Sequence, residues 1–203
     1  MNKLIKKIIN KKNKSKVICL TAYSKNIAAE VDKYADITLV GDSLGSVLYN
    51  YKSTRSVSLT EMINHSKSVR LAVKKSLMVV DMPYNTYATN TSALKNAKKI
   101  IKYTKCDAVK LEGGKKIIKQ IKFLIKNKIK VMGHLGLLPQ TTKGKFKSKG
   151  KTNKEKKQLL NDAISLEKSG VFAIVLECVK SSVAKQITQQ LKIPTIGIGS
   201  SVH

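Results

Sequence analysis

The sequence predicts a barrel of parallel β-strands in which each strand is followed by an α-helix. Short apolar runs rich in Val, Ile, Leu and Met alternate with longer segments of helical periodicity, as in repeated βα units. Several runs also end in an acid, a lysine or a histidine, and the carboxyl ends of barrel strands would gather such residues on one rim. The chain has 203 residues, whereas eight βα units need roughly 250, so we expect one barrel domain over residues 1–203 that is incomplete at its carboxyl end.

Seven strands are predicted, because seven apolar runs have strand length and the composition of a strand covered on both faces. They span residues 17–22, 37–41, 77–81, 108–112, 130–133, 172–177 and 195–198. Six helices are predicted between them, at residues 26–33, 59–74, 91–104, 115–127, 154–169 and 181–191. Ser58 with Glu61 three residues later is a capping-box pattern for the second helix, and Thr91-Ser92 is interpreted as the start of the third.

Residues 141–153 are predicted to form a loop. Lys, Gly, Ser and Thr crowd together there around one aromatic residue, Phe146. A loop on the catalytic rim of a barrel can act as a lid, and a lysine-rich loop can equally be plain solvated chain. Both interpretations stay open from the sequence.

Lysine dominates the charge of the chain. Lys and Arg number 40 against 12 Asp and Glu, and the resulting formal charge of +28 could attract nucleic acid or anionic lipid. However, Arg55 and Arg70 are the only arginines, and abundant Lys, Ile and Asn are typical of an A+T-rich genome. The basic residues are spread over most predicted helices without a nucleic-acid-binding motif, so we expect no nucleic acid partner.

Cysteine usage and hydropathy indicate a soluble protein of the cytoplasm. Cys19, Cys106 and Cys178 are odd in number and show no C-x-x-C spacing, which argues against a disulfide framework and a structural zinc site. Lysines interrupt the apolar residues at the start of the chain, and no apolar run reaches the ~18 residues of a membrane span. We therefore expect no membrane partner.

Three acids stand at the ends of the second, third and fourth predicted strands: Asp42, Asp81 and Glu112. Mg²⁺ prefers oxygen ligands and usually takes one or two protein carboxylates, with water and substrate completing its coordination. A single acid of this kind could instead be an ion-pair partner or a helix cap, but three at successive strand ends outline a magnesium site. Lys110 and Glu112 are two residues apart and so point to the same side of their strand, where one could bind a substrate anion while the other serves the metal.

Seven motifs resemble, in order and spacing, those of the ketopantoate hydroxymethyltransferase family. They are residues 21–23 (TAY), 40–45 (VGDSLG), 81–84 (DMPY), 109–114 (VKLEGG), 133–140 (GHLGLLPQ), 176–179 (LECV) and 193–199 (IPTIGIG). The resemblance implies a (β/α)8 TIM barrel of the phosphoenolpyruvate/pyruvate superfamily, apparently truncated after the seventh strand. It also implies an enzyme of pantothenate biosynthesis that forms homo-oligomers.

The resemblance implies a reaction and a metal site. Family members use Mg²⁺ and transfer a one-carbon unit from 5,10-methylenetetrahydrofolate to 3-methyl-2-oxobutanoate, which gives 2-dehydropantoate. By resemblance, Asp42 and Asp81 are direct metal ligands, and Glu112 is a third acid at the metal that acts through water. A metal bound to the ketone and carboxylate of a 2-oxo acid would act as a Lewis acid and stabilise the enolate.

The resemblance also assigns the substrate contacts. Ser43 and Lys110 match the groups that hold the carboxylate and keto oxygen of the substrate, next to the metal-binding Asp42 and Asp81. His134 matches a histidine that hydrogen-bonds the keto acid or its enolate. Glu177, at the end of the sixth predicted strand, matches the general base that removes the proton from C3.

The chain departs from the family pattern in three places. Ser24 stands where the family has an acid, the loop after Gln140 is shorter, and the chain stops soon after Gly199, whereas relatives continue through an eighth strand. Three other interpretations therefore stay open: an inactive truncated remnant, a basic nucleic-acid-binding protein, and another Mg²⁺-dependent enzyme of the superfamily that makes or breaks a C–C bond of a 2-oxo acid.

Overall fold

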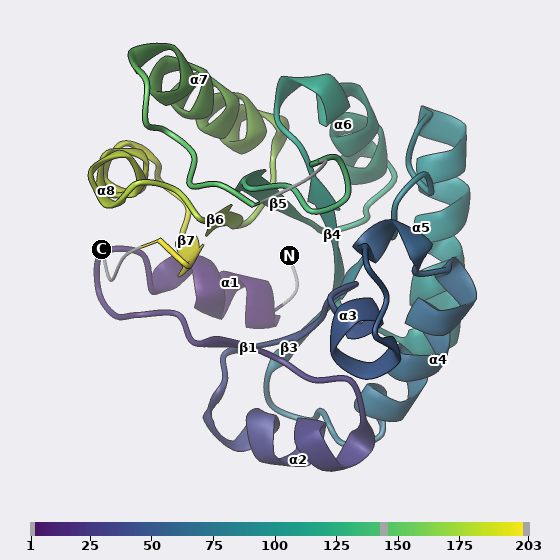
Figure 1. Cartoon of the computed structure of the whole chain (residues 1–203). Coiled ribbons are helices and arrows are strands. Elements are labelled where there is room, and N and C mark those ends of the chain that lie inside the picture. The colour runs from purple at the N-terminus through teal and green to yellow at the C-terminus, as the bar shows by residue number, and fades with distance from the viewer. Residues whose placement is uncertain (1–2, 143–145, 201–203) are drawn as a thin grey trace.

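The strands of the molecule form one parallel sheet that curls into a nearly closed barrel (Figure 1). The computed structural model describes residues 3–142 and 146–200. Within them the strands follow one another around the sheet in chain order: β1 (Cys19–Thr21), β2 (Ile37–Val40), β3 (Leu77–Asp81), β4 (Ala108–Glu112), β5 (Val131–Gly136), β6 (Ile174–Glu177) and β7 (Thr195–Ile198). All seven predicted strands are confirmed, and β3, β4 and β7 have the predicted bounds.

Helices surround the sheet and follow most of its strands, as βα units require. They are α1 (Lys3–Asn10), α2 (Lys25–Tyr34), α3 (Leu44–Tyr49), α4 (Leu59–Arg70), α5 (Asn90–Thr104), α6 (Ile118–Lys126), α7 (Asn153–Ser169) and α8 (Ser181–Gln190), with short 3-10 helices η1 (Thr54–Ser56) and η2 (Lys115–Ile117). Figure 1 shows the longer helices outside the barrel and α1 lying across it. The described residues contain no helix with the length and apolar character needed to cross a bilayer.

Several predicted boundaries were wrong, each for a local reason. The predicted strand at 130–133 continues to Gly136, because His134 and Leu135 still pair with β6. The second predicted helix ends at Arg70, and the third begins after Thr89, whose side chain forms a capping box with Ser92. The predicted helix at 115–127 starts as a 3-10 turn. The capping box of Ser58 and Glu61 is confirmed.

Helix α1 was not predicted, and it closes the amino end of the barrel. Its Ile5 and Ile8 are buried and pack in one apolar cluster with Ile37, Leu77 and Ala108, the first residues of β2, β3 and β4. Lysines interrupt the apolar residues of this segment, so its amphipathic pattern is weak in the sequence. Two isoleucines three residues apart are nevertheless enough for a helix of this length to bury one face. The apolar floor of the barrel therefore depends on the first ten residues.

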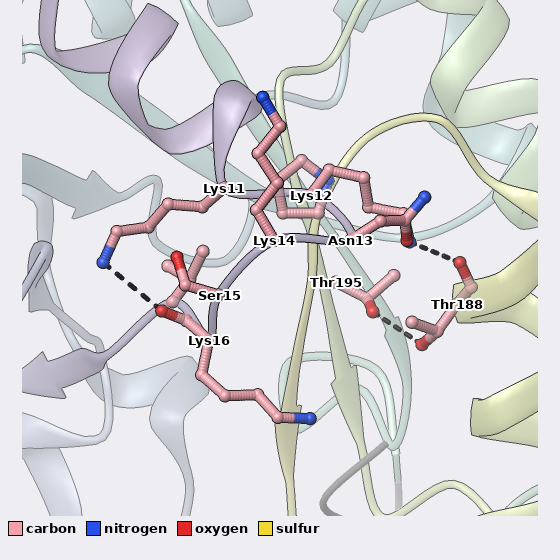
Figure 2. Close-up of a pocket in the computed structure, with 10 residues that line it drawn as sticks. Lys11, Lys12, Asn13, Lys14, Ser15, Lys16, Thr188 and Thr195 are labelled. Carbon is pink, nitrogen blue, oxygen red and sulfur yellow. Dashed lines mark hydrogen bonds between the residues drawn. The ribbon is translucent and has the colours of Figure 1, made fainter.

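The sheet is open between β1 and β7, which do not pair within the described residues. Large apolar side chains on these edge strands are exposed, with Leu20 at 43% and Ile198 at 55% of their surface. At the amino end of this opening lies a cavity of about 480 Å³, lined by the turn at 11–16 with Val17, Thr188, Pro194 and Thr195 (Figure 2). The Lys12 ammonium donates to the carbonyl of Thr188 across it, so the turn after α1 is tied to α8.

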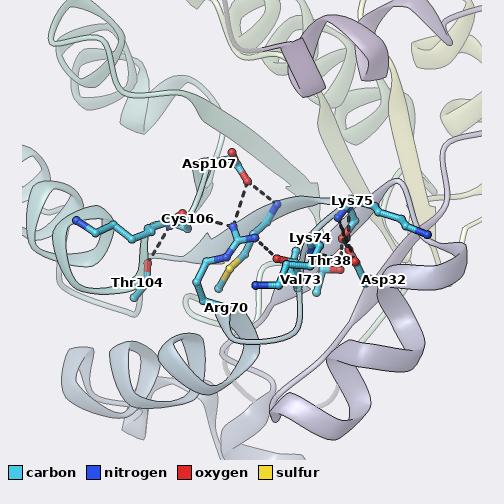
Figure 3. A network of polar contacts seen from close by, with 12 residues as sticks. Asp32, Thr38, Arg70, Val73, Lys74, Lys75, Thr104, Cys106 and Asp107 are labelled. Carbon is cyan, nitrogen blue, oxygen red and sulfur yellow. Dashed lines mark hydrogen bonds and ion pairs between the residues drawn. The ribbon is translucent and has the colours of Figure 1, made fainter.

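A polar network ties helix α2 to the amino ends of β2 and β3 (Figure 3). The Asp32 carboxylate accepts backbone N–H groups of Lys74, Lys75 and Ser76 at 2.8–3.1 Å and the Ser76 hydroxyl at 2.7 Å. Ser76 Oγ also lies 2.6 Å from Thr38 Oγ1. Burial acts to raise the pKa of Asp32, but these hydrogen bonds outweigh it and lower the pKa overall. The turn before β3 is thus fixed by one carboxylate.

Replacing Asp32 by Asn should lower the free energy of unfolding at pH 7 by about 1.5–3 kcal/mol, the usual value of hydrogen bonds to a charged group. Because folding lowers the pKa of Asp32, its contribution is complete above the unfolded pKa of about 3.9 and is lost as the pH falls through the folded pKa. Urea unfolding at pH 7 and at lower pH measures both effects. The exposed Glu30→Gln on the same helix is the control, and equal stabilities of the two variants at pH 7 would contradict the prediction.

Candidate active site

The inward-facing side chains of the barrel change from apolar to polar along the strands. At the amino ends the inward positions are Ile37, Leu77, Ala108, Met132 and Val175, which share one buried cluster with α1. Side chains two residues apart on a strand point the same way. The next inward positions toward the carboxyl ends therefore include Asp81, Lys110, Glu112, His134 and Glu177. The strand period alone brings five of the predicted site residues to one rim of the barrel.

Asp42 and Asp81 are adjacent and buried. The backbone N–H of Asp42 donates to Asp81 Oδ2 at 3.1 Å. Gly41 leaves room for the Ser43 hydroxyl, since a Cβ at that position would lie 2.9 Å from Ser43 Oγ, whereas its distance of 3.5 Å from Asp81 Oδ2 would be an ordinary contact. Ser43 precedes α3 without capping it, and its hydroxyl lies 2.7 Å from the hydroxyl of Tyr23.

Lys110 supplies the positive charge among these acids. Its Nζ lies 3.2 Å from Asp81 Oδ1 and 3.2 Å from His134 Nδ1. In the described part of the chain it is the one lysine that is buried. Burial acts to lower the pKa of Lys110, but Asp81, Glu112 and Asp42 outweigh it and raise the pKa overall. The ammonium therefore stays charged inside the barrel.

His134 joins Lys110 and Glu112 to Glu177. Its Nδ1 lies 3.5 Å from Glu112 Oε1, and its Nε2 lies 3.2 Å from Glu177 Oε2, although the second pair is not aligned as a hydrogen bond. Lys110 and Glu112 compete for Nδ1, since an ammonium needs a bare nitrogen and a carboxylate needs an N–H. Burial and Lys110 lower the pKa of His134, whereas Glu112 and Glu177 raise it, and the net direction is upward.

Glu177 is the acid of the rim that reaches solvent. Its side chain is 22% exposed, compared with 3% for Glu112 and 4% for Asp81. The backbone of Glu177 is fixed by Gly136, because Leu137 N–H donates to the Glu177 carbonyl at 2.8 Å and a Cβ on Gly136 would stand 2.1 Å from that oxygen. Gly136 has φ +97°, which an L side chain rarely adopts, so glycine is required here. Glu177 therefore lies at the border between the buried acids and the opening.

The buried charges of the site do not balance. Asp42, Asp81 and Glu112 are buried carboxylates, and Lys110 neutralises one of them. Burial and the neighbouring Asp81 raise the pKa of Asp42 to about 7, and burial raises the pKa of Asp81 despite Lys110. For Glu112, burial acts to raise the pKa, but His134, Lys110 and Gln140 outweigh it and lower the pKa overall. With all three acids ionised and His134 neutral, Lys110 would leave two negative charges unbalanced, which is the charge that a divalent cation would match.

The donor set fits Mg²⁺ in the manner that this ion prefers. Asp81 Oδ1 is buried and pairs with the Lys110 ammonium at 3.2 Å, but it accepts no well-aligned hydrogen bond from the described residues. In residues 3–142 and 146–200, no three His, Cys, Asp or Glu side chains are placed so that together they could hold a metal ion. An arrangement of two direct carboxylates, with a third acid acting through water, needs no such cage because Mg²⁺ keeps several waters. The predicted roles of Asp42, Asp81 and Glu112 are compatible with this geometry.

Gln140 and Tyr87 belong to the site and were missed as site residues. Gln140 Nε2 donates to Asp42 Oδ2 at 2.7 Å, and the Gln140 backbone N–H donates to Glu112 Oε2 at 3.1 Å. The Tyr87 hydroxyl donates to Gln140 Oε1. Burial and Glu112 raise the pKa of Tyr87, so that this hydroxyl keeps its proton. A neutral amide in a loop gives no charge or periodicity signal. Gln140 entered the sequence analysis only as the last residue of a motif.

The remaining departures lie around the rim. Ser24 is the N-cap of α2, and its side chain makes no capping hydrogen bond. Within the predicted loop at 141–153, residues 143–145 lie outside the described part of the chain. Further along, Lys149 N–H donates to the carbonyl of Cys178, and Lys180 N–H donates to the carbonyl of Lys149. This part of the loop is therefore fastened to the chain just after Glu177.

Comparison with known proteins identifies related sequences over the whole chain. The family model described as ketopantoate hydroxymethyltransferase matches residues 2–203. A 3-methyl-2-oxobutanoate hydroxymethyltransferase of Pelagibacter ubique (strain HTCC1062) is 66% identical over 203 residues, which are 100% of this chain and 79% of that protein. The protein of the same name from Anaplasma marginale (strain St. Maries) is 47% identical over 193 residues, 94% of this chain and 70% of that protein.

Solved structures with the same fold are distant in sequence. A 2,3-dimethylmalate lyase, described as a PEP mutase/isocitrate lyase superfamily member, aligns with a TM-score of 0.68 at 12% identity and covers 97% of this chain and 72% of its own. A phosphoenolpyruvate phosphomutase from Streptomyces platensis subsp. rosaceus aligns with a TM-score of 0.70 at 11% identity, over 96% of this chain and 71% of its own. At such identities the likeness shows the barrel fold alone.

Replacing Lys110 by Met should lower the free energy of unfolding by about 3–5 kcal/mol, because the buried carboxylates lose their ammonium partner. Urea unfolding in EDTA measures this without a divalent cation. Lys98→Met, at an exposed position of α5, is the matched control. A loss no larger than that of the control would show that Lys110 does not balance the buried acids.

Proposed function

Since the chain belongs to the ketopantoate hydroxymethyltransferase family and is a hydroxymethyltransferase of pantothenate biosynthesis, we propose that it converts 3-methyl-2-oxobutanoate into 2-dehydropantoate, with 5,10-methylenetetrahydrofolate as the one-carbon donor and Mg²⁺ at the site. The buried cluster of three carboxylates around Lys110, with Glu177 at its open edge, is the observation that supports this reaction. It combines a place for a chelated 2-oxo acid with a base beside it.

Asp42 and Asp81 would hold the metal directly, and Glu112 would hold it through water. Each of these carboxylates already has one oxygen engaged with a neighbouring N–H, at Gln140 Nε2, Asp42 N and Gln140 N respectively. When bound, Mg²⁺ supplies Lewis-acid chemistry that draws electrons from the ketone of a 2-oxo acid. The described residues therefore prepare both the charge and the orientation of the donors.

Ser43 and Lys110 would hold the substrate. Ser43 is half-buried beside Asp42, and its hydroxyl can donate to a carboxylate while it accepts from Tyr23. Lys110 carries a permanent charge within 3.2 Å of Asp81, so it would lie close to a keto acid bound at the metal. A fixed positive charge near a developing oxyanion lowers the barrier without reorganisation during the reaction.

Glu177 would act as the general base. Its Oε2 is 3.2 Å from His134 Nε2, at the edge of the buried cluster. Glu177 takes the proton from C3 of the keto acid, and the electron pair left on C3 forms a bond to the one-carbon unit. The overall transfer consumes one water: its oxygen becomes the hydroxyl of the new CH2OH group, both C–N bonds of the folate's methylene bridge break, and tetrahydrofolate leaves with a proton on each of the two nitrogens. His134 would hydrogen-bond the keto acid or its enolate.

The competing interpretations are not favoured. Relatives at 66% and 47% identity carry one name, 3-methyl-2-oxobutanoate hydroxymethyltransferase, which favours this reaction over other C–C bond chemistry of the superfamily. An inactive remnant or a nucleic-acid-binding protein would have no need of the buried acids. We place the enzyme in the cytoplasm as a homo-oligomer acting on small molecules; its three cysteines are free, in keeping with a reducing compartment.

Glu177→Gln should lower the turnover of 3-methyl-2-oxobutanoate by about 10²–10⁴-fold, because the amide cannot accept the C3 proton. Exchange of the C3 proton with deuterated solvent, followed by NMR without folate, should fall by a similar factor. The Glu30→Gln variant of α2 is the control for a surface acid. Comparable proton exchange in Glu177→Gln and the parent would remove Glu177 as the base.

Mg²⁺ should raise the melting temperature of the purified protein. At a Mg²⁺ concentration of 100 times its dissociation constant the stabilisation is about 2.7 kcal/mol, which is roughly 5–10 °C for a chain of this size. Calorimetry with and without EDTA measures the shift. Asp81→Asn should abolish the shift even where it alters the melting temperature in EDTA; a full shift in this variant would argue against Asp81 as a ligand.

A further inference from the structure

Gln140 connects four of the strand ends that carry the site. It lies in the loop after β5, in a turn where Thr141 and Thr142 N–H groups both donate to the carbonyl of Leu138. Its side chain is 1% exposed. Its hydrogen bonds reach Asp42 after β2, Met82 after β3 and Glu112 at the end of β4. Among the described residues, no other residue hydrogen-bonds to both Asp42 and Glu112.

The partners of the Gln140 amide fix which way round it lies. Nε2 is 2.7 Å from Asp42 Oδ2 and 3.0 Å from the Met82 carbonyl, and a carboxylate and a carbonyl can only accept. Oε1 accepts from the Tyr87 hydroxyl, which also lies 3.4 Å from the Glu112 carbonyl. A flipped amide would place its carbonyl against two acceptors. Tyr87 and Gln140 therefore form a short chain of hydrogen bonds that ends on Asp42.

The neutrality of the Gln140 side chain matters as much as its hydrogen bonds. Lys110 already neutralises one of the buried carboxylates. A second cation in place of Gln140 would orient Asp42 equally well but would remove the negative charge that attracts a divalent ion. An amide orients the carboxylate and leaves its charge intact. Gln140 also occupies one oxygen each of Asp42 and Glu112. The other oxygen of Asp42 is left for a further partner, and Glu112 Oε1 lies 3.5 Å from His134 Nδ1.

We propose that Gln140, held by Tyr87, is a positioning residue that sets the affinity of the site for a divalent cation by fixing Asp42 and Glu112 without neutralising them. This proposal rests on the proposed function, since it presupposes a cation at these acids. Gln140 itself does not touch the metal or the substrate. Its loss therefore weakens the binding of the cation more than it slows the cation-loaded enzyme.

The test is the binding of Mn²⁺, a hard cation that takes the same oxygen ligands as Mg²⁺ and is visible by electron paramagnetic resonance. Gln140→Met keeps the length and volume of the side chain and removes its hydrogen bonds. Its Mn²⁺ dissociation constant should rise by about 10–100-fold, the usual effect of losing a partner that orients a metal ligand. Gln189→Met, the same replacement at an exposed position of α8, should bind Mn²⁺ as the parent does.

Enzyme kinetics separate positioning from a general structural defect. In Gln140→Met the Mg²⁺ concentration for half-maximal turnover should rise with the Mn²⁺ dissociation constant, and by a larger factor than the fall in turnover at saturating Mg²⁺. Tyr87→Phe, which removes only the hydroxyl that orients the amide, should weaken Mn²⁺ binding by a smaller factor. If Gln140→Met does not fold, as judged by circular dichroism, Tyr87→Phe decides the question.

The outcomes distinguish this proposal from the one on which it rests. Parental Mn²⁺ affinity in Gln140→Met, or in Tyr87→Phe where the first variant does not fold, would overturn the positioning role while the parent's own Mn²⁺ binding upholds the metal site. Failure of the parent protein to bind Mn²⁺ at all would overturn both. Reduced Mn²⁺ affinity in Gln140→Met with unchanged Gln189→Met would support both.

Discussion

The rest of the site depends on holding like charges close together away from water. Asp42, Asp81 and Glu112 repel one another where charge is poorly screened, and burial favours their neutral forms. One ammonium, that of Lys110, offsets part of this repulsion. Uncharged N–H groups donate to other oxygens of these carboxylates. With the three acids ionised, this arrangement leaves an excess of negative charge. The proposed divalent cation would balance that excess.

The interior of the barrel has two layers, and the buried charges lie in the one at the carboxyl ends of the strands. The same strands that place Leu77 and Ala108 on an apolar floor place Asp81 and Lys110 above it, because inward positions repeat every second residue. Both the apolar floor and the polar site therefore depend on the same strand register. A slip of one residue would turn the acids outward and expose the side chains of the floor. Helix α1 seals that floor from below, so the amino-terminal segment supports a site to which it contributes no polar group.

The predictable part of the molecule is the part governed by strand burial. Runs such as 77–81 and 108–112 are rich in apolar residues and end in an acid, so both the strands and the acids could be located from the sequence. The rest depends on contacts between distant segments. The turn before β3 is fixed by Asp32 of helix α2, β5 is extended by its pairing with β6, and Gln140 acquires its partners only when four strand ends converge. None of these leaves a periodic or charged signature in its own neighbourhood.

Within the described residues, β1 and β7 are the unpaired edges of the sheet, and local fraying is expected to begin there. β1 and β7 each hydrogen-bond to one neighbouring strand, whereas β2 to β6 each have two. Backbone amides at such margins exchange with solvent through local fraying, while central strands open only with the whole unit. The acids, the lysine and the histidine all lie on or directly after the five inner strands. Local fraying of the edge strands would thus leave the predicted site residues held by the inner strands.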